Sequence, residues 1–243
     1  MARLVIVSNR VPSLSKREQQ SGGLAVALHE ALKDEALWFG WSGRIAGETG
    51  EKPAIATRGS ITYATIDLGE NDYRHYYAGF ANSSLWPLLH YRSGLVAFSR
   101  EDYRGYRATN RKFAAALSKL IAPDDLIWVH DYHLIPLAQA LRALGCRNRI
   151  GFFLHIPFPP PSFFEILPPA GELLADLSAY DVTGFQTERD RRNFFDCFLE
   201  LGAAQTDKAA RVMKHAVAIP VGIDAAEFQK IARKVEASEE VTR

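Results

Sequence analysis

Short apolar runs rich in β-branched residues alternate with longer amphipathic segments along most of the chain. The run Leu126–Val129 is apolar at every position, as expected of a strand in a sheet that is covered on both faces. Alternation of such strands with helices is typical of an α/β fold with a mostly parallel sheet. We therefore predict a Rossmann-like domain, in which ligands bind at the carboxyl edge of the sheet.

The boundaries of the predicted elements follow from these patterns. We expect strands at Arg3–Ser8, Leu37–Ser42, Ser60–Asp67, Leu126–His130, Arg149–Ile156, Thr183–Gln186 and Ala216–Val221. We expect helices at Leu24–Lys33, Asn71–His90, Glu101–Ile121, Ile135–Leu144, Leu173–Tyr180, Glu188–Leu201 and Ala225–Arg233. Gly79 and the polar run Asn82–Ser84 predict a break in the second of these helices, near Asn82. The charged segment from about residue 225 to 243 is interpreted as a linker or a solvated helix end.

Size and charge limit the classes of function. The chain has 243 residues, of which 47% are hydrophobic, enough for one large domain or two small ones. Its 29 Lys and Arg and 28 Asp and Glu nearly cancel, so neither a nucleic-acid nor a membrane partner is expected. No apolar stretch approaches the ~20 residues of a membrane helix, and two cysteines fit a reducing compartment. We expect a cytoplasmic protein.

Two features near the N-terminus suit a phosphate group. Arg10 follows the first predicted strand, and arginine grips phosphate oxygens with a planar fork of donors. Gly22 and Gly23 precede a predicted helix, whose free amide groups and positive dipole end favour an anion. The sequence around these glycines is neither a Walker loop nor a dinucleotide-binding fingerprint. Taken singly, a solvated arginine and a plain glycine turn are the alternative interpretations.

Histidines end two neighbouring predicted strands. His130, Asp131 and His133 lie at the end of the most apolar strand, and His155 closes the next. A metal site is one interpretation of His130 and His133, but no Cys or third His lies at ligand spacing. Asp131 is better suited to accept hydrogen bonds from hydroxyl groups. We therefore favour sugar or structural polar contacts over a metal, and His155 is either a core residue or part of a shared site.

Tyr77 and Trp86 supply aromatic faces of the kind that stack on the C–H face of a sugar, although burial in the core is the alternative. They lie nine residues apart, a spacing that would place them on opposite sides of one unbroken α-helix. The predicted break near Asn82 would allow them to converge.

Nine motifs occur in register between Leu4 and Asp224. They are Leu4–Arg10, Ser21–Ala25, Leu37–Gly43, Leu85–Pro87, His90–Arg92, Trp128–Leu134, Arg149–Pro159, Tyr180–Asp181 with Gly184–Thr187, and Pro220–Asp224. Taken together and in this order, they resemble glycosyltransferase family 20.

The resemblance implies the N-terminal half of a GT-B fold, in which two Rossmann-like domains face each other across a cleft. Residues 1–243 would then form a single Rossmann-like acceptor-binding domain. The family transfers glucose from UDP-glucose to glucose-6-phosphate, retains the anomeric configuration and makes trehalose-6-phosphate. It uses no metal or other cofactor. The implied partners are therefore small-molecule substrates, and homo-oligomers of a full-length form are left open.

The same resemblance assigns roles to individual residues. The acceptor site is matched by Arg10, Tyr77, Trp86 and Asp131, with Arg10 at the 6-phosphate. The donor site is matched by Gly22 and Gly23, in the loop that closes on the donor, and by His155, which contacts the donor glucose. Asp131 and His155 are the expected catalytic residues. The segment Pro160–Glu165 departs from relatives, which commonly place an acidic residue near position 162.

Two other functions fit these residues. One is a related synthase with another phosphorylated acceptor, and the other is a non-catalytic sugar-phosphate-binding domain. Arg10 together with the aromatic pair and Asp131 favours a phosphorylated hexose. The family's second domain, which holds the UDP diphosphate, is not part of these 243 residues. We therefore expect the chain by itself to fold but not to transfer glucose.

Overall fold

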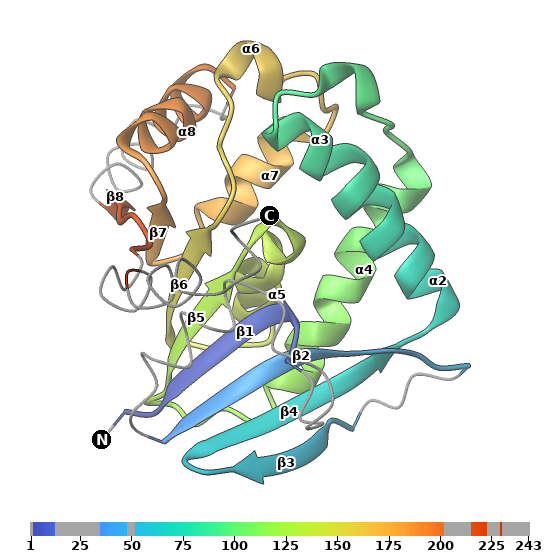
Figure 1. Ribbon diagram of the computed structural model, residues 1–243, viewed down its shortest axis with the longest axis vertical. Helices are drawn as coiled ribbons and strands as arrows, with labels where there is room; N and C mark the ends of the chain where they lie inside the picture. Colours follow the sequence, from blue (N-terminus) through green and yellow to red (C-terminus); the bar gives the residue numbers. More distant parts are fainter. Residues whose placement is uncertain (1, 13–34, 48–51, 202–214, 223–228, 230–243) are drawn as a thin grey trace, which may run out of the picture.

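The computed structural model describes residues 2–12, 35–47, 52–201, 215–222 and 229. The helix expected at 24–33, together with Gly22 and Gly23, lies outside these ranges. So do the helix expected at 225–233 and the linker from about 225, apart from residue 229. Within them, a twisted sheet forms the centre of the molecule and helices pack against it (Figure 1).

The sheet has eight strands. They are β1 (Leu4–Arg10), β2 (Ala36–Ile45), β3 (Ala54–Arg58), β4 (Ile61–Leu68), β5 (Leu126–His130), β6 (Arg149–Leu154), β7 (Val182–Phe185) and β8 (Ala216–Ala218). Their order across the sheet is β3-β4-β2-β1-β5-β6-β7-β8, and every neighbouring pair is parallel except β3 with β4. The predicted α/β class with a mostly parallel sheet is confirmed.

The sequence does not predict the antiparallel edge strand β3. All five of its residues are exposed, and a two-residue turn at Gly59 and Ser60 joins it to β4. Because β3 buries neither face, its sequence carries no alternation of apolar and polar residues. Two predicted strands are also too long, since β6 ends at Leu154 and β8 at Ala218.

The helical elements occupy the intervening segments. They are α2 (Glu70–Asp72), η1 (Tyr73–Leu85), α3 (Trp86–Leu89), η2 (Ser93–Leu95), α4 (Arg100–Leu117), η3 (Tyr132–Leu134), α5 (Leu137–Ala143), α6 (Pro161–Phe164), α7 (Ala170–Leu177) and α8 (Glu188–Glu200). Most pack on the sheet face that carries Val5 and Val7, where the larger apolar core forms. The opposite face holds a smaller cluster around Ile6 and Trp38, as expected from the alternation of side chains along β1.

The predicted break near Asn82 is wrong, because the helix runs without interruption from Glu70 to Leu89. Its middle part, η1, is a π-helix, with i→i+5 bonds such as the one from the amide of Trp86 to the carbonyl of Ala81. A π-helix has more residues per turn than an α-helix, so the step of nine positions from Tyr77 to Trp86 makes about two turns. These two residues therefore share one side of the helix for a reason other than the one predicted.

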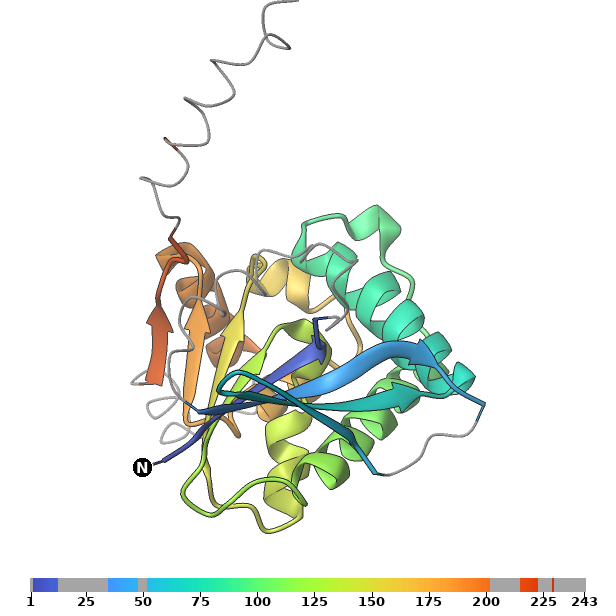
Figure 2. The same cartoon turned by 60° about the horizontal axis from the view of Figure 1, so that its bottom comes forward.

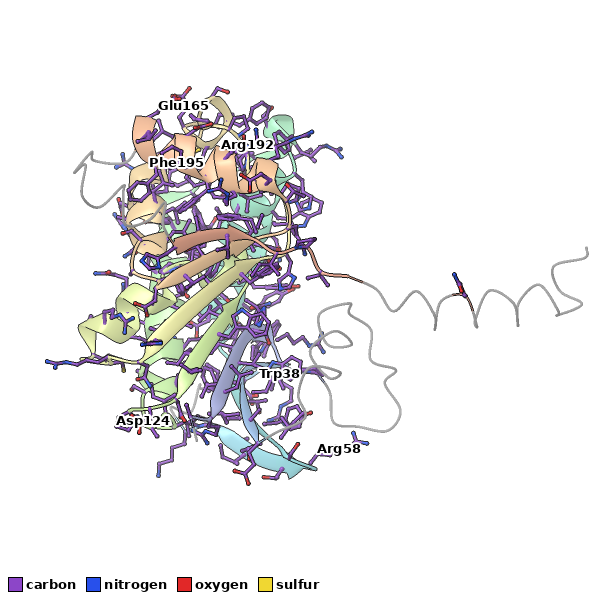
Figure 3. The ribbon with its side chains drawn as sticks, turned by 90° about the vertical axis from the view of Figure 1, so that its left-hand side faces the viewer. Trp38, Arg58, Asp124, Glu165, Arg192 and Phe195 are labelled. Atoms are coloured by element: carbon purple, nitrogen blue, oxygen red, sulfur yellow. The ribbon has the colours of Figure 1, made fainter. Side chains whose placement is uncertain are left out.

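The strand order places a topological switch point between β1 and β5. From β1 the chain continues outward to β2 and β4 on one side, and from β5 to β6 and β7 on the other. Connections that depart in opposite directions leave a crevice at the carboxyl ends of the strands, where ligands bind in such folds. In Figure 2 the arrowheads of these strands fan from β7, which points upward, to β2 and β4, which point to the right, as expected of a twisted parallel sheet. In Figure 3, Asp124, which precedes β5, and Glu165, which follows β6, lie at opposite ends of the molecule.

Candidate functional site

The structure brings the predicted polar residues to one edge of the sheet. Arg10 ends β1, Asp131 follows β5, and His155 follows β6. The register pairs Val7 with Val129 and His130 with Phe153, so the three strand ends lie level with one another. The edge is the one that contains the switch point. Gly22 and Gly23, predicted for the same site, are outside the described residues.

A β-bulge at Asn9 directs Arg10. In the ladder between β1 and β2, Ser8 pairs with Gly40 and Arg10 pairs with Trp41, so Asn9 is the extra residue. Such a bulge re-aims the side chain that follows it. The hydroxyl of Ser8 donates to the carbonyl of Arg10 at 2.9 Å. The hydroxyl of the buried Tyr76 donates to Oδ1 of Asn9 at 2.8 Å.

The guanidinium of Arg10 lies against the backbone of Gly43. A methyl group at Gly43 would approach Nε and Cζ of Arg10 to 2.6 and 2.8 Å, so the guanidinium would have to move. Gly43 also has a φ of +90°, a conformation that favours glycine. The backbone conformation therefore favours a glycine here, and the absence of a side chain lets the guanidinium occupy this position.

Aromatic rings form one wall beside these strand ends. The ring of Tyr77 lies 5.4 Å from that of Trp41 and 5.5 Å from that of Tyr73. It also stacks on the imidazole of His133, at 5.7 Å with an interplanar angle of 13°. The half-buried Tyr77 is thus held by rings from β2, η1 and η3.

One stripe of the helix continues this wall. Tyr73, Tyr77, Asn82 and Trp86 are spaced by four, five and four residues, which matches the wide turn of a π-helix. Oδ1 of Asn82 accepts a hydrogen bond from the hydroxyl of Tyr132 at 2.8 Å, so the stripe faces the segment after β5. Trp86 is 40% exposed, with its indole 4.2 Å from the ring of His90, and presents an aromatic surface to solvent.

Asp131 adopts a strained backbone conformation. Its φ of 76° and ψ of 164° lie in a region used almost only by glycine. Strain of this kind costs about 1–3 kcal/mol and persists where the surroundings enforce it. Here the amide of Asp131 donates to the carbonyl of Phe153 at 2.9 Å.

The segment after Asp131 is tied down through its carbonyl groups. The hydroxyl of Tyr106 donates to the backbone carbonyl of Tyr132 at 2.6 Å. The side-chain amide of Asn110 donates to the backbone carbonyl of His133 at 3.1 Å. The hydroxyl of Tyr180 donates to the backbone carbonyl of Leu134 at 2.7 Å. These bonds come from α4 and from the segment after α7. They hold the conformation in which Asp131 sits at the sheet edge.

Burial controls the charge of Asp131. Desolvation raises its pKa to about 6, against weaker opposing hydrogen bonds from the amides of Tyr132 and His155. The carboxyl group is therefore ionised at neutral pH and protonated in mild acid. As a carboxylate it only accepts hydrogen bonds, which suits it to hold a hydroxyl group.

Three histidines around Asp131 are neutral. Burial lowers the pKa of His130 to about 3, that of His133 to about 3 and that of His155 to about 4. Nδ1 of His130 and Nε2 of His155 share a hydrogen bond of 3.0 Å. Within the described residues, both ring nitrogens of His133 and Nε2 of His130 are buried without a partner. Those residues contain no group of three or more side chains arranged to hold a metal ion.

Sequence reasoning missed several parts of this site. Trp41 and His133 hold Tyr77, and Asn82, interpreted as a helix break, bonds Tyr132. The four-five-four spacing of the aromatic stripe was the available signal for the π-helix. The bulge at Asn9 has no comparable signal.

A pocket of about 390 Å³ lies elsewhere, between the end of β4 and α4. None of the predicted site residues lines it. Its Lys112 is paired with Asp72 at 2.6 Å, and its Asp67 with Arg44 at 3.0 Å. Arg111 and Lys119 also line this pocket, but the residues predicted for the site converge elsewhere, so we place the site at the sheet edge. No helix among the described residues is long and apolar enough to cross a membrane.

Comparison with known proteins identifies close relatives. A family model described as glycosyltransferase family 20 matches residues 2–243. A trehalose-6-phosphate synthase of Sinorhizobium fredii is 46% identical over 253 aligned positions, which cover all of this chain and 54% of that protein. A solved UDP-forming α,α-trehalose-phosphate synthase from Burkholderia vietnamiensis superimposes with a TM-score of 0.92 at 44% identity, over all of this chain and 54% of that one.

A second solved structure is that of the enzyme from Burkholderia xenovorans in complex with glucose-6-phosphate. It superimposes with a TM-score of 0.88 at 43% identity and covers 99% of this chain and 55% of that one. The chain thus spans about half the length of the relatives it matches.

Proposed function

The chain belongs to glycosyltransferase family 20, and from this premise we propose that it provides the acceptor side of a retaining glucosyltransferase. The reaction would move glucose from UDP-glucose to glucose-6-phosphate and form trehalose-6-phosphate. Residues 1–243 would constitute a Rossmann-like acceptor-binding domain of a GT-B enzyme. Relatives named as UDP-forming, one of them in complex with glucose-6-phosphate, support this choice of substrates.

The observation that carries the proposal is the convergence of three kinds of group at the switch point. A cationic fork (Arg10), an aromatic stripe containing Tyr77 and Trp86, and a carboxylate (Asp131) approach the same strand ends. These groups complement a phosphate, the apolar face of a sugar ring and a sugar hydroxyl, respectively. A phosphorylated hexose contains all three, whereas a phosphorylated glycerol lacks the ring.

The chemistry of the transfer gives each group a task. A retaining front-face transfer requires the acceptor hydroxyl to be held close to the donor carbon while the diphosphate departs. Arg10 would fix the acceptor through its phosphate, and the ionised Asp131 would accept a hydrogen bond from a hydroxyl. Because its neighbours already enforce the conformation of Asp131, little further ordering is needed when the sugar binds. His155, after the adjacent strand, would contact the donor glucose.

The proposal includes no metal ion or other cofactor. In this chemistry, cationic side chains and amide dipoles stabilise the leaving diphosphate. We also propose a cytoplasmic location, which the free thiols of Cys146 and Cys197 support, since thiols persist in reducing compartments.

Calorimetric titration of the 243-residue chain tests the acceptor site. Glucose-6-phosphate, glucose and inorganic phosphate would be titrated separately under the same conditions. We expect glucose-6-phosphate to bind at least tenfold more tightly than glucose, because a charge-assisted hydrogen bond is worth about 1.5–3 kcal/mol. Inorganic phosphate should bind more weakly than the sugar phosphate, because it leaves the aromatic stripe unused. Equal affinities for glucose and glucose-6-phosphate would exclude the proposed phosphate contact.

A further inference from the structure

The end of β5 contributes a second histidine that the proposed function does not use. His130 is 1% exposed, and its ring contacts those of Trp128 and His155, with centroids 4.4 and 5.2 Å away. Its Nδ1 and Nε2 of His155 are 3.0 Å apart. Since burial keeps both imidazoles neutral, one of these two nitrogens must carry the proton and the other must accept it.

The surroundings of His130 decide between the two arrangements. Its second nitrogen, Nε2, is shielded from solvent and has no hydrogen-bond partner within the described part of the chain. If Nδ1 of His130 were the acceptor, the ring proton would sit on Nε2 as a buried donor with no acceptor among the described residues. Among backbone groups, buried N–H donors without a partner are rarer than under-satisfied carbonyl acceptors, and we extend this preference to the imidazole, whose Nε2 would then be an unpartnered acceptor. Placing the proton on Nδ1 avoids an unpartnered N–H group and makes His130 the donor in its hydrogen bond with His155.

The protonation of His130 also determines which nitrogen of His155 carries its proton. If Nε2 of His155 accepts the bond, the proton of His155 must lie on its Nδ1. His155 is only partly buried, and its Nδ1 is not among the buried unpartnered atoms of the described residues. That nitrogen therefore faces solvent at the sheet edge as a donor.

We propose that His130 is a positioning residue that fixes His155 as the Nδ1–H tautomer, so that His155 offers a hydrogen-bond donor to an oxygen atom of a bound sugar. The bound oxygen would be a hydroxyl or ring oxygen of the donor glucose, and this part rests on the proposed function. The tautomer itself does not, because it follows from the contacts of the two rings.

Nuclear magnetic resonance tests the tautomer directly. Long-range ¹H–¹⁵N spectra of the chain labelled at its seven histidines distinguish a protonated ring nitrogen from a bare one. His155→Gln assigns the resonances of His155. We expect a bare Nε2 and a protonated Nδ1 on His155. A protonated Nε2 would overturn the proposal, and this measurement needs no variant of His130.

Two nearly isosteric substitutions show whether His130 is the cause. His130→Asn keeps an N–H donor near the position of Nδ1, whereas His130→Asp replaces it with an acceptor. We expect His155 to keep its tautomer in the Asn variant and to carry a proton on Nε2 in the Asp variant. The same His155 tautomer in both variants would contradict a positioning role. A merely structural effect would not separate them in this way.

Titration with UDP-glucose addresses the sugar contact separately, in a fusion of these 243 residues with the C-terminal part of the Sinorhizobium fredii relative, because the family's second domain is expected to hold the diphosphate. We expect the ligand to shift the resonances of His155, and His130→Asp to weaken its binding about tenfold relative to His130→Asn, the effect of losing one hydrogen bond. If UDP-glucose leaves His155 unshifted while the tautomer is as proposed, the proposed function fails and the positioning role stands.

Discussion

Buried carboxylates on the flank formed by α2, α4 and α7 have charged partners, whereas several buried polar atoms at the sheet edge have no partner within the described residues. On the flank, the buried Asp72 and Asp176 each meet a cation, Lys112 and Arg107. At the edge, His130 and His133 bury ring nitrogens without a partner in the described residues, and Asp131 is strained.

This difference indicates where the fold is optimised for stability and where it is not. Three of the four buried unpartnered side-chain atoms among the described residues lie at the strand ends where we propose that a polar ligand binds, as expected of functional sites. The fourth, Oδ1 of Asn110, is on α4. The ion pairs of the flank hold the helices that support this edge. The following predictions separate the two regions, because changes on one should affect stability and changes on the other should affect binding.

The largest effect is expected on the flank. Arg107→Ala leaves the carboxylate of Asp176, whose side chain is 4% exposed, without its cation. Loss of one partner of a buried pair costs about 3–5 kcal/mol, and partial exposure of Arg107 reduces this to about 2–4 kcal/mol. Urea unfolding measures the loss, with Arg111→Ala, exposed on the same helix, as the control. A similar loss in both variants would show that the pair has no special role.

Arg10→Ala should act on binding instead. We expect the affinity for glucose-6-phosphate to fall tenfold to a hundredfold, since the contact is worth about 1.5–3 kcal/mol. Because Arg10 is exposed, the free energy of unfolding should change by no more than about 0.5 kcal/mol. Arg10→Lys keeps the charge but loses the fork, and should recover only part of the affinity. Unchanged binding in Arg10→Ala would place the phosphate elsewhere.

The raised pKa of Asp131 predicts that its contribution to the free energy of unfolding falls as the pH rises. A carboxylate in a typical ion pair has a lowered pKa and contributes more as the pH rises. The folded-state pKa of Asp131 is about 6, against 3.8 for an ordinary aspartate, so its contribution to stability is lost as the pH rises from about 4 to about 6. Asp131→Asn should therefore gain about 1–3 kcal/mol relative to the wild type between pH 4 and pH 7. The neutral histidines affect both proteins alike and cancel in this difference. A difference that is independent of pH would contradict the prediction.

A smaller effect should follow from the bond that holds the bulge. Tyr76→Phe removes the donor to Asn9 and should cost about 1 kcal/mol of stability. Because Asn9 precedes Arg10, we also expect a twofold to fivefold loss of glucose-6-phosphate affinity. This loss corresponds to less than ~1 kcal/mol, the net contribution of one hydrogen bond, because the bond to Asn9 acts on the ligand only through Arg10. Tyr103→Phe removes a tyrosine hydroxyl bond on the flank, to Glu172 at 2.8 Å, and should leave the affinity unchanged. Equal affinities in the two variants would remove the link between the bulge and binding.

The sequence predicts the parallel strands well because they are continuous apolar runs, as in Leu126–Val129. It fails for β3, whose residues are all exposed, and for the helix around Asn82. In the helix, Gly79 indicates a break, but in the structure a side chain here would collide with Asp102 of α4, so the glycine permits close packing of two helices.

The location of the candidate site also follows from the sequence, because Arg10, Asp131 and His155 come at strand ends. Its internal geometry does not. The backbone conformation of Asp131 is enforced by a carbonyl on β6, and the bond between His130 and His155 joins residues on different strands. Such contacts depend on tertiary packing, which a local pattern does not encode.

The most direct test of the account compares glycine with alanine at position 131. Both variants lack the carboxylate and should bind glucose-6-phosphate at least tenfold more weakly than the wild type, from the loss of a charge-assisted hydrogen bond of about 1.5–3 kcal/mol. In ordinary helices and strands, glycine is less stable than alanine by about 0.5–1 kcal/mol. At a φ of 76° and ψ of 164° the order should reverse, and urea unfolding should find Asp131→Gly more stable than Asp131→Ala by about 1–2 kcal/mol. Alanine at least as stable as glycine, or undiminished binding in both variants, would contradict a strained carboxylate held in place for the ligand.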